Sequence, residues 1–453
     1  MAGLRSANFA HERVPEMEPR GDTGLDMVLS MLSTTTHTNL DRRFISGGKP
    51  SIQVVPSFLR SIKKVERLFS PDIIAIGPCH RGSPHLQSME EIKKMAANEF
   101  CCSSTVHQVR DFYLNVHKVA EKARESYAHP VRMNEDEFTA MLFLDGCFLL
   151  QFMTMVALDR GPPLHWRMPQ LSENWMRRIS RDILLVENQI PWVVLEALMC
   201  LKHVLVDRYV ADTISNFDVQ GAEPQVDFEG ADKYQPFHLL DLVRHRQIGP
   251  FRSRMVAADE APRPILNISS ALELAGIGVH ITASKTARFA DMGVEENPLF
   301  GKLWLPPVHL GELTMSLLIN MAVFELLQGG TSDADYGASS YMQVMAVLMN
   351  REEDVRQLRA KRILYPVFSD QETLDFFKSV CPYLQYGRQY DRILQRLSDY
   401  QQDRTLRVAL HKFVYNNLKY LLTSGSAFGL LIPLLRAVLS LKETKENAPA
   451  AGS

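Results

Sequence analysis

Three short stretches of the chain bring together side chains that could bind metals or carry out catalysis. The densest is Cys79-His80-Arg81-Gly82, with His85 shortly after it. Thiolate and imidazole are good zinc donors, but a structural zinc site needs four protein ligands, and this spacing matches no familiar zinc pattern. A glycine- and proline-rich turn, with His80 hydrogen-bonded to nearby backbone, is the simpler interpretation. We therefore predict no metal site and no cofactor at this stretch.

The other two stretches place carboxylates in apolar surroundings. Asp145 is the only charge between Phe138 and Leu158, and Cys147 follows it closely. The polar trio Glu187-Asn188-Gln189 separates two apolar runs and is followed by Pro191. A thiol inside an apolar helix usually has a raised pKa and is inert, whereas a buried carboxyl group with a raised pKa can act as a general acid. Each of these two stretches can therefore be interpreted in two ways, as a structural feature or as part of a catalytic site.

The structural interpretation is that these residues tie helices together. A buried polar group left without a hydrogen bond costs about 1–3 kcal/mol, so such groups are normally satisfied inside the fold. We predict no catalytic residue and a structural polar corner satisfied inside one helical core, made of Asp145, Glu187, Asn188, Gln189 and Pro191. The alternative is an uncharacterised enzyme with a hidden Cys/His or carboxylate site near residues 79–85, 145–147 or 187. That alternative requires these groups to converge on one pocket that reaches solvent.

Composition excludes several functional classes. The chain has a formal net charge of −2, from 50 Lys and Arg against 52 Asp and Glu, so no global field indicates nucleic acid as a partner. The sequence contains no P-loop, no GxGxxG after a strand, no HExxH and no GxSxG motif. The 6 cysteines show no CxxC spacing, and the first thirty residues lack the apolar core of a secretory signal. These features predict a cytosolic main domain with reduced thiols.

The elements that must position the polar groups are predicted to be helices. Asn134 and Glu137 form a capping-box pair, and the apolar run from Phe138 to Leu158 follows. This run is long enough to span a bilayer, but a carboxylate at mid-span is expensive, so we predict a central helix buried by other helices. At the polar corner we expect one helix to end near Val186 and a second to run from Pro191, because proline is tolerated in a first helical turn.

The predicted fold class is mainly α, a large multi-helix globular bundle. After Gly276 the hydrophobic period changes, and residues 277–282, 287–294 and 303–305 predict one small antiparallel β-meander at about 277–305. Further helices are predicted from apolar spacing at 56–64, from 86, 106–123, 238–246, 269–275, 313–327, 339–349, 352–359, 372–380 and 389–422.

The two ends of the chain differ from the main body. We predict a flexible leader at 1–50, a helical domain at 51–422, a candidate membrane helix at 423–441 and a polar tail at 442–453. The stretch from Tyr420 to Leu435 carries no formal charge, which is marginal for a membrane span by length. A hydrophobic C-terminal helix docked on the protein's own bundle is the alternative.

The order of several motifs resembles the plant family called domain of unknown function 247. The corner Asp182–Pro191 and the upstream Leu144–Phe148 carry the resemblance. Further motifs in the same order extend the resemblance over about residues 50–422. These motifs are Ile76-Gly77-Pro78 with His80 and Gly82, Met89-Glu90 with Lys93, His238–Leu242, Ser270–Gly276, Asn320 with Phe324-Glu325, and Tyr341-Met342 with Asp354-Val355. The family usually has an aromatic residue and a second histidine where this chain has Cys79 and Arg81.

The resemblance implies a mostly helical protein that ends in a single membrane-spanning helix with a very short tail. It implies no established enzymatic activity, and some family members are implicated in self-recognition between pollen and stigma in grasses. We therefore expect a non-enzymatic protein anchored in a membrane by residues 423–441, with its main domain in the cytosol and with protein partners rather than nucleic acid. The alternatives are the enzyme described above and a fully soluble cytoplasmic scaffold.

Overall fold

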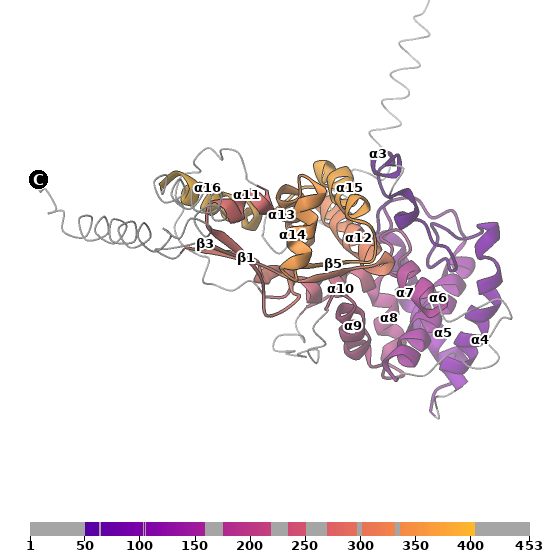
Figure 1. The fold of residues 1–453 in the computed structure, drawn as a ribbon. Helices are drawn as coiled ribbons and strands as arrows, with labels where there is room; N and C mark the ends of the chain where they lie inside the picture. The colour runs from indigo at the N-terminus through magenta and orange to yellow at the C-terminus, as the bar shows by residue number, and fades with distance from the viewer. Residues whose placement is uncertain are drawn as a thin grey trace, which may run out of the picture. The chain divides into compact units, whose positions relative to one another are not determined.

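The fold is mainly helical, as predicted, with two small sheets (Figure 1). It is known from a computed structural model that describes residues 50–62, 65–102, 104, 106–158, 175–218, 234–250, 270–296, 301–330 and 336–403. The predicted leader, apart from Pro50, lies outside these residues, as do the predicted helix at 423–441 and the predicted tail at 442–453.

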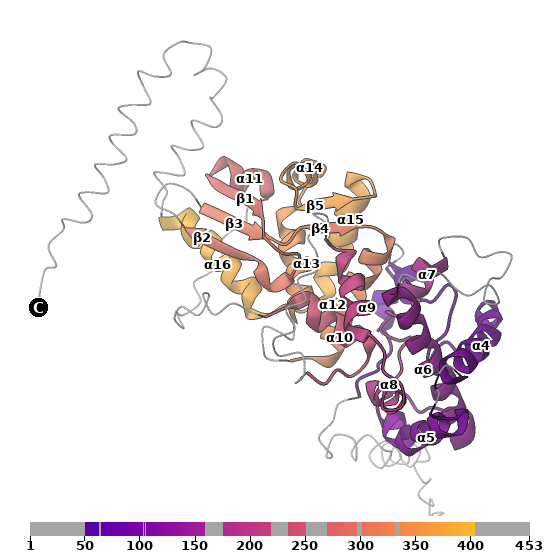
Figure 2. The same cartoon turned by 90° about the horizontal axis from the view of Figure 1, so that it is seen from below.

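A long apolar helix, α6 (Glu135–Ala157), is the centre of the first group of helices. It begins where predicted, because the Asn134 side chain accepts a hydrogen bond from the Glu137 N–H at 2.8 Å. Helices α4 (Ser88–Cys102), α5 (Val109–Glu125), α8 (Trp192–Met199) and α9 (Val206–Ser215) pack around α6 (Figures 1 and 2). By length and composition, α6 is the one described helix that could cross a membrane, yet 78% of its most apolar window is buried.

The polar corner joins α7 (Trp175–Asp182) to α8. Pro191 precedes the first residue of α8 as its N-cap, close to the predicted start. However, α7 ends at Asp182, so the prediction of a helix reaching Val186 is wrong. The reason is that the Val186 N–H, which a continuing helix would direct to the Asp182 carbonyl, donates to the Asn320 side chain at 2.9 Å, while the Asn188 side chain donates to that carbonyl at 2.8 Å.

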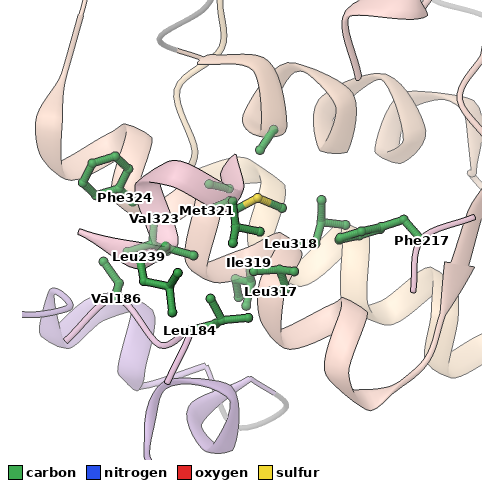
Figure 3. Close-up of a cluster of buried hydrophobic side chains, with 14 of the residues drawn as sticks. Leu184, Val186, Phe217, Leu239, Leu317, Leu318, Ile319, Met321, Val323 and Phe324 are labelled. Carbon is green, nitrogen blue, oxygen red and sulfur yellow. The ribbon is translucent and has the colours of Figure 1, made fainter. Parts of the chain in front are cut away.

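A second buried helix, α12 (Glu312–Gln328), contacts the corner. It packs against α7, α10 (Leu239–Ile248) and α13 (Gly337–Leu348). Figure 3 shows Leu184 and Val186 of the corner next to Leu239 and to the apolar side chains of α12. Removing this apolar surface from water stabilises the contact by about 25 cal/mol for each Å² buried.

The sheets differ from the predicted antiparallel meander. Strand β3 (Gly301–Leu305) lies in the middle of the first sheet, parallel to β1 (Val279–Ala283) and antiparallel to β2 (Gly293–Glu296). The meander is wrong because β3 lies between β1 and β2 and pairs with β1 in parallel, so β1 and β2, whose connection contains a 3₁₀ turn at residues 289–291, do not pair directly. A second sheet pairs β4 (Val308–Leu310) with β5 (Leu364–Pro366) in parallel, which the sequence analysis did not predict.

The remaining elements cover these sheets and helices. Helix α11 (Ala271–Gly276) packs on β1, α14 (Glu352–Ala360) on β5, and α16 (Arg388–Asp403) beside β2 and α13 (Figure 2). The predicted extension of α16 to residue 422 lies outside the described residues. The bounds are α3 (Ser57–Arg60), η1 (Glu66–Phe69), η2 (Pro84–Leu86), α11 (Ala271–Gly276), η6 (Phe289–Asp291), α14 (Glu352–Ala360), α15 (Asp370–Val380), η8 (Cys381–Tyr383) and α16 (Arg388–Asp403).

Candidate functional site: the polar corner and its pocket

The carboxylate of Glu187 lies at the centre of the corner, and its side chain is only 1% exposed. One oxygen accepts the backbone N–H of Val55, and the other accepts the guanidinium of Arg60. His80 Nε2 lies 3.4 Å from this second oxygen, and Cys79 Sγ lies 3.7 Å from it. Burial by itself would raise the pKa of Glu187, but the contacts with His80, Arg60 and the Val55 N–H lower it below its ordinary value. Glu187 is therefore an anion in the folded protein.

Asn188 and Gln189 use their side chains to hold backbone both within the corner and distant in sequence. The amide of Asn188 accepts the Ile76 N–H at 2.7 Å and donates to the Ile74 carbonyl at 2.9 Å. Gln189 donates to the carbonyls of Ile183 and Leu185 and accepts the Leu240 N–H at 3.3 Å. These two amides therefore connect the corner to the extended segment 72–79 and to the start of α10.

Asp145 of α6 also bonds the segment 72–79. Its Oδ2 accepts the Gly77 N–H at 2.8 Å, and its Oδ1 lies 2.7 Å from Lys93 Nζ of α4. Lys93 also contacts Glu90 at 2.7 Å. Burial disfavours the charged form of Lys93, but the carboxylates of Asp145 and Glu90 outweigh this effect and raise its pKa. Lys93 is therefore a buried cation that compensates the charge of Asp145.

Gly77 allows the extended segment to approach the corner closely. Its φ is +73°, a conformation that favours glycine, and a Cβ atom at this position would lie 2.5 Å from the Gln189 carbonyl oxygen. The Tyr127 hydroxyl donates to the same carbonyl at 3.2 Å. The turn around residues 77–82 is thus held in place by contacts with the corner.

Several buried polar residues that tie the same core together were not singled out as site residues from sequence. Asp182 accepts the N–H groups of Asp72, Ile73 and Ile74 at 2.6–3.1 Å. Asn320 of α12 accepts the Val186 N–H at 2.9 Å. Glu325, also on α12, accepts the Arg244 guanidinium and the N–H groups at the start of α13. A polar residue inside an apolar helical run, as at Asn320 and Glu325, is the sequence signal that could have found the last two.

A pocket of about 520 Å³ opens beside Glu187 and Cys79. It lies between three segments of the chain, which are residues 52–54, residues 78–81 and the loop 127–133. Its walls are apolar at Ile52, Val54, Pro78, Pro130, Val131 and Met133. Arg81, His129 and Arg132 also line it. The sequence analysis did not identify this pocket, because the loop 127–133 carries no hydrophobic period and no motif.

The structure brings some of the suspected catalytic groups together and separates others. Cys79, His80 and Glu187 place one ligand atom each within 4.8 Å of one another. Asp145 does not line the pocket, and Cys147 is buried in α6, where burial and the neighbouring thiol of Cys101 raise its pKa. His85 contacts the Pro71 carbonyl at 3.3 Å instead.

The cluster of Cys79, His80 and Glu187 is the place where a divalent cation could be held. Two features oppose it. The Arg60 guanidinium already neutralises Glu187, and a second cation at the same carboxylate would be repelled. Cys79 is exposed as a residue, but desolvation of its thiol, followed by the charge of Glu187 beside it, raises the pKa of the thiol to about 12, so a thiolate is not available at neutral pH. The geometry thus favours an Arg–Glu ion pair over a metal.

Comparisons with known proteins are consistent with the motifs. The family model of domain of unknown function 247, described as plant protein of unknown function, matches residues 52–432. The Arabidopsis thaliana protein named UPF0481 protein At3g47200 is 26% identical over 367 residues, which are 74% of this chain and 73% of that protein. Putative UPF0481 protein At3g02645, also from Arabidopsis thaliana, is 27% identical over 127 residues, or 28% of this chain and 23% of that protein. No solved structure matches the chain.

Proposed function

The chain belongs to the plant family of domain of unknown function 247, and from this premise we propose that it is a non-enzymatic protein that binds other proteins while anchored in a membrane. The non-enzymatic part of the proposal rests on the bonds that the two buried carboxylates of the corner make within the fold. Glu187 is held by Arg60 and the Val55 N–H, and Asp145 by Lys93 and the Gly77 N–H. Groups held in this way maintain a fold and are not free to exchange protons with a substrate.

An exposed aromatic pair supports the proposal of protein partners. Phe58 of α3 and Tyr383 of η8 are 46% and 47% exposed, and their ring centroids lie 5.7 Å apart. An aromatic side chain that stays exposed to water does not contribute the favourable free energy of burial, and aromatic residues are enriched at protein–protein interfaces. We propose this pair as part of a surface that a partner protein covers.

The membrane anchor is proposed from sequence and from the family. Residues 423–441 follow a stretch with Arg404, Arg407, Lys412 and Lys419, and basic residues are more frequent on the cytosolic side of a span. This arrangement supports an anchor with the main domain in the cytosol. The helix α6 is not the proposed anchor, because its apolar surface is used in packing.

The anchor is tested by carbonate-resistant pelleting of the full chain and of two truncated forms. We expect the full chain and a form ending at residue 441 to remain with the membranes, and a form ending at residue 422 to be released. The form ending at 441 is the matched control, because it lacks only the polar tail. Release of all three forms would refute the anchor and would favour the soluble scaffold.

Partners are tested by proximity labelling in plant cells with the full chain and with the double variant Phe58→Ala/Tyr383→Ala. Leu114→Ala is the control, because Leu114 is similarly exposed, at 43%, on a different helix. We expect the double variant to lose labelled proteins that the control retains. Identical sets of labelled proteins would show that the aromatic pair is not a partner surface.

The enzyme alternative keeps one observation in its favour, which is the convergence of Cys79, His80 and Glu187, two of which, Cys79 and Glu187, also line the pocket. A cysteine nucleophile must be a thiolate, and the raised pKa of Cys79 opposes this role. Rapid alkylation of Cys79 at neutral pH would support the enzyme, and slow alkylation supports the proposal made here.

A further inference from the structure

We propose that the pocket beside the polar corner binds a small organic anion with an apolar body. The pocket has a volume of about 520 Å³, within the range of about 300–1,000 Å³ typical of small-molecule sites. It is a pocket open to solvent and bordered by three segments, and its volume fits a small molecule rather than a macromolecule. This inference concerns ligand binding and does not depend on the membrane anchor or on the aromatic pair.

The walls of the pocket define the body of the ligand. Ile52, Val54, Val131 and Met133 contribute apolar side chains from two different segments, with Pro78 and Pro130 between them. An aromatic or aliphatic body placed among these side chains leaves water and is stabilised by about 25 cal/mol for each Å² buried. A fully polar ligand would leave this apolar lining without a contact.

The charges at the pocket define the polar end of the ligand. Arg81 and Arg132 line the pocket, and both are exposed. Among the described residues, neither arginine makes an ion pair or hydrogen bond with another side chain. The one carboxylate in the lining is Glu187, and Arg60 already neutralises it. A ligand carboxylate or sulfonate would thus meet two guanidinium groups without an opposing negative charge, and a guanidinium binds such oxyanions well.

The pocket is preformed, because hydrogen bonds from the surrounding structure hold each of its three segments. Arg124 donates to the carbonyls of Val131 and Met133, both at 3.0 Å, and this fixes the loop 127–133 against α5. Ile52 pairs with Tyr127 through a backbone bridge, and the Val55 N–H is bonded to Glu187. The Gly77 N–H bonded to Asp145 anchors the start of segment 78–81. A preformed pocket loses little conformational entropy when it binds a ligand.

The proposal is tested by calorimetric titration of the full chain with three probes that share one apolar body. The probes are 2-naphthoate, the neutral 2-naphthalenemethanol and the cationic 2-naphthylmethylammonium. We expect 2-naphthoate to bind most tightly and the cation most weakly. Absence of naphthoate binding, or equal affinity for all three probes, would overturn the proposal.

Variants of residues that line the pocket test whether 2-naphthoate binds there. Exposed ion pairs contribute modestly, so we expect Arg81→Gln and Arg132→Gln each to weaken naphthoate binding about two- to fivefold, and the double variant about tenfold. Val54→Asp, which places a carboxylate in the wall, should weaken it further. Arg110→Gln is the control, because Arg110 is exposed on α5 and does not line the pocket. Equal affinities in the double variant and in this control would also overturn the proposal.

Discussion

The buried ion pair between Lys93 and Asp145 gives the sharpest test of the idea that the polar residues hold the fold. The side chains of Lys93 and Asp145 are 2% and 1% exposed, and their charged atoms lie 2.7 Å apart. The change to make is Asp145→Asn, because the new amide oxygen can still accept the Gly77 N–H while the negative charge is removed. The variant thus leaves the buried cation of Lys93 without its main partner.

The expected loss follows from the surroundings of Lys93. Removing one partner of a buried ion pair typically costs about 3–5 kcal/mol, because a charge is left buried without compensation. Glu90 remains 2.7 Å from Lys93 and is 31% exposed, so it compensates part of this charge. We therefore expect Asp145→Asn to lower the free energy of unfolding by about 3 kcal/mol, at the lower end of that range.

The double variant Asp145→Asn/Lys93→Met separates loss of the pair from loss of packing. It removes both charges and fills the space of the lysine stem with an apolar side chain. Replacing both partners of a buried pair by groups of similar volume is often close to neutral. We therefore expect the double variant to be more stable than Asp145→Asn alone, which would be a favourable coupling between the two sites.

The assay is urea unfolding of the full chain, followed by circular dichroism. Glu91→Gln is the matched control, because Glu91 and Lys94 form a pair of the same 2.7 Å length on the same helix but are 66% and 58% exposed. Exposed pairs contribute about 0.2–1 kcal/mol, so the control should lose little. The single variant Lys93→Met completes the comparison. The reasoning is refuted if Asp145→Asn loses no more stability than Glu91→Gln, or if the loss in the double variant equals the sum of the losses in Asp145→Asn and Lys93→Met.

Two further predictions concern the turn that carries Cys79. Gly77→Ala should lower the melting temperature strongly, because the new Cβ would lie 2.5 Å from the Gln189 carbonyl oxygen. At Gly82 a new Cβ meets no atom within 4 Å, so Gly82→Ala should lower the free energy of unfolding by only about 1–2 kcal/mol, the cost of a left-handed backbone at φ +84°. Equal losses for the two alanine variants would show that the contact with Gln189 is unimportant. At pH 9, Cys79 should be alkylated by iodoacetamide more slowly in the folded chain than in the urea-unfolded chain, because folding raises its pKa from 9.0 to about 12. The folded state therefore keeps this proton, so the contribution of Cys79 to stability is complete below pH 9 and falls as the pH rises towards 12. Mass spectrometry of the labelled peptides gives both rates, with the exposed Cys102 as internal control, and equal rates for Cys79 in the two states would contradict the prediction.

Local signals in the sequence were sufficient to find most helices. The start of α6 follows from Asn134 and Glu137, whose reciprocal hydrogen bonds join residues only three positions apart. The end of α7 could not be found in this way. Its apolar pattern continues to Val186, but the Val186 N–H donates to Asn320 of α12, 134 positions away, and not to the Asp182 carbonyl, to which the Asn188 side chain donates. A competing tertiary hydrogen bond thus overrode the helical period.

The sheet was the least predictable part of the fold. Three short apolar segments close together in sequence indicated a meander, but β1 pairs with β3 in parallel, so that Val279 lies opposite Gly301. Strand pairing depends on contacts between segments and on the path of the connection, here a 3₁₀ turn at residues 289–291. The β4–β5 pair joins residues that are more than fifty positions apart, and periodicity carries no information about such a partner.

By itself the sequence determined the helical class, the family and the identity of the corner residues, because these depend on residue type, spacing and motif order. Only the tertiary structure decided what those residues do. Glu187 is bonded to the Val55 N–H, 132 positions away, and Asn188 to the Ile76 N–H, 112 positions away. The pocket beside them exists because three segments, at 52–54, 78–81 and 127–133, meet there. A cavity is a property of packing between distant parts of the chain, and no local pattern encodes it.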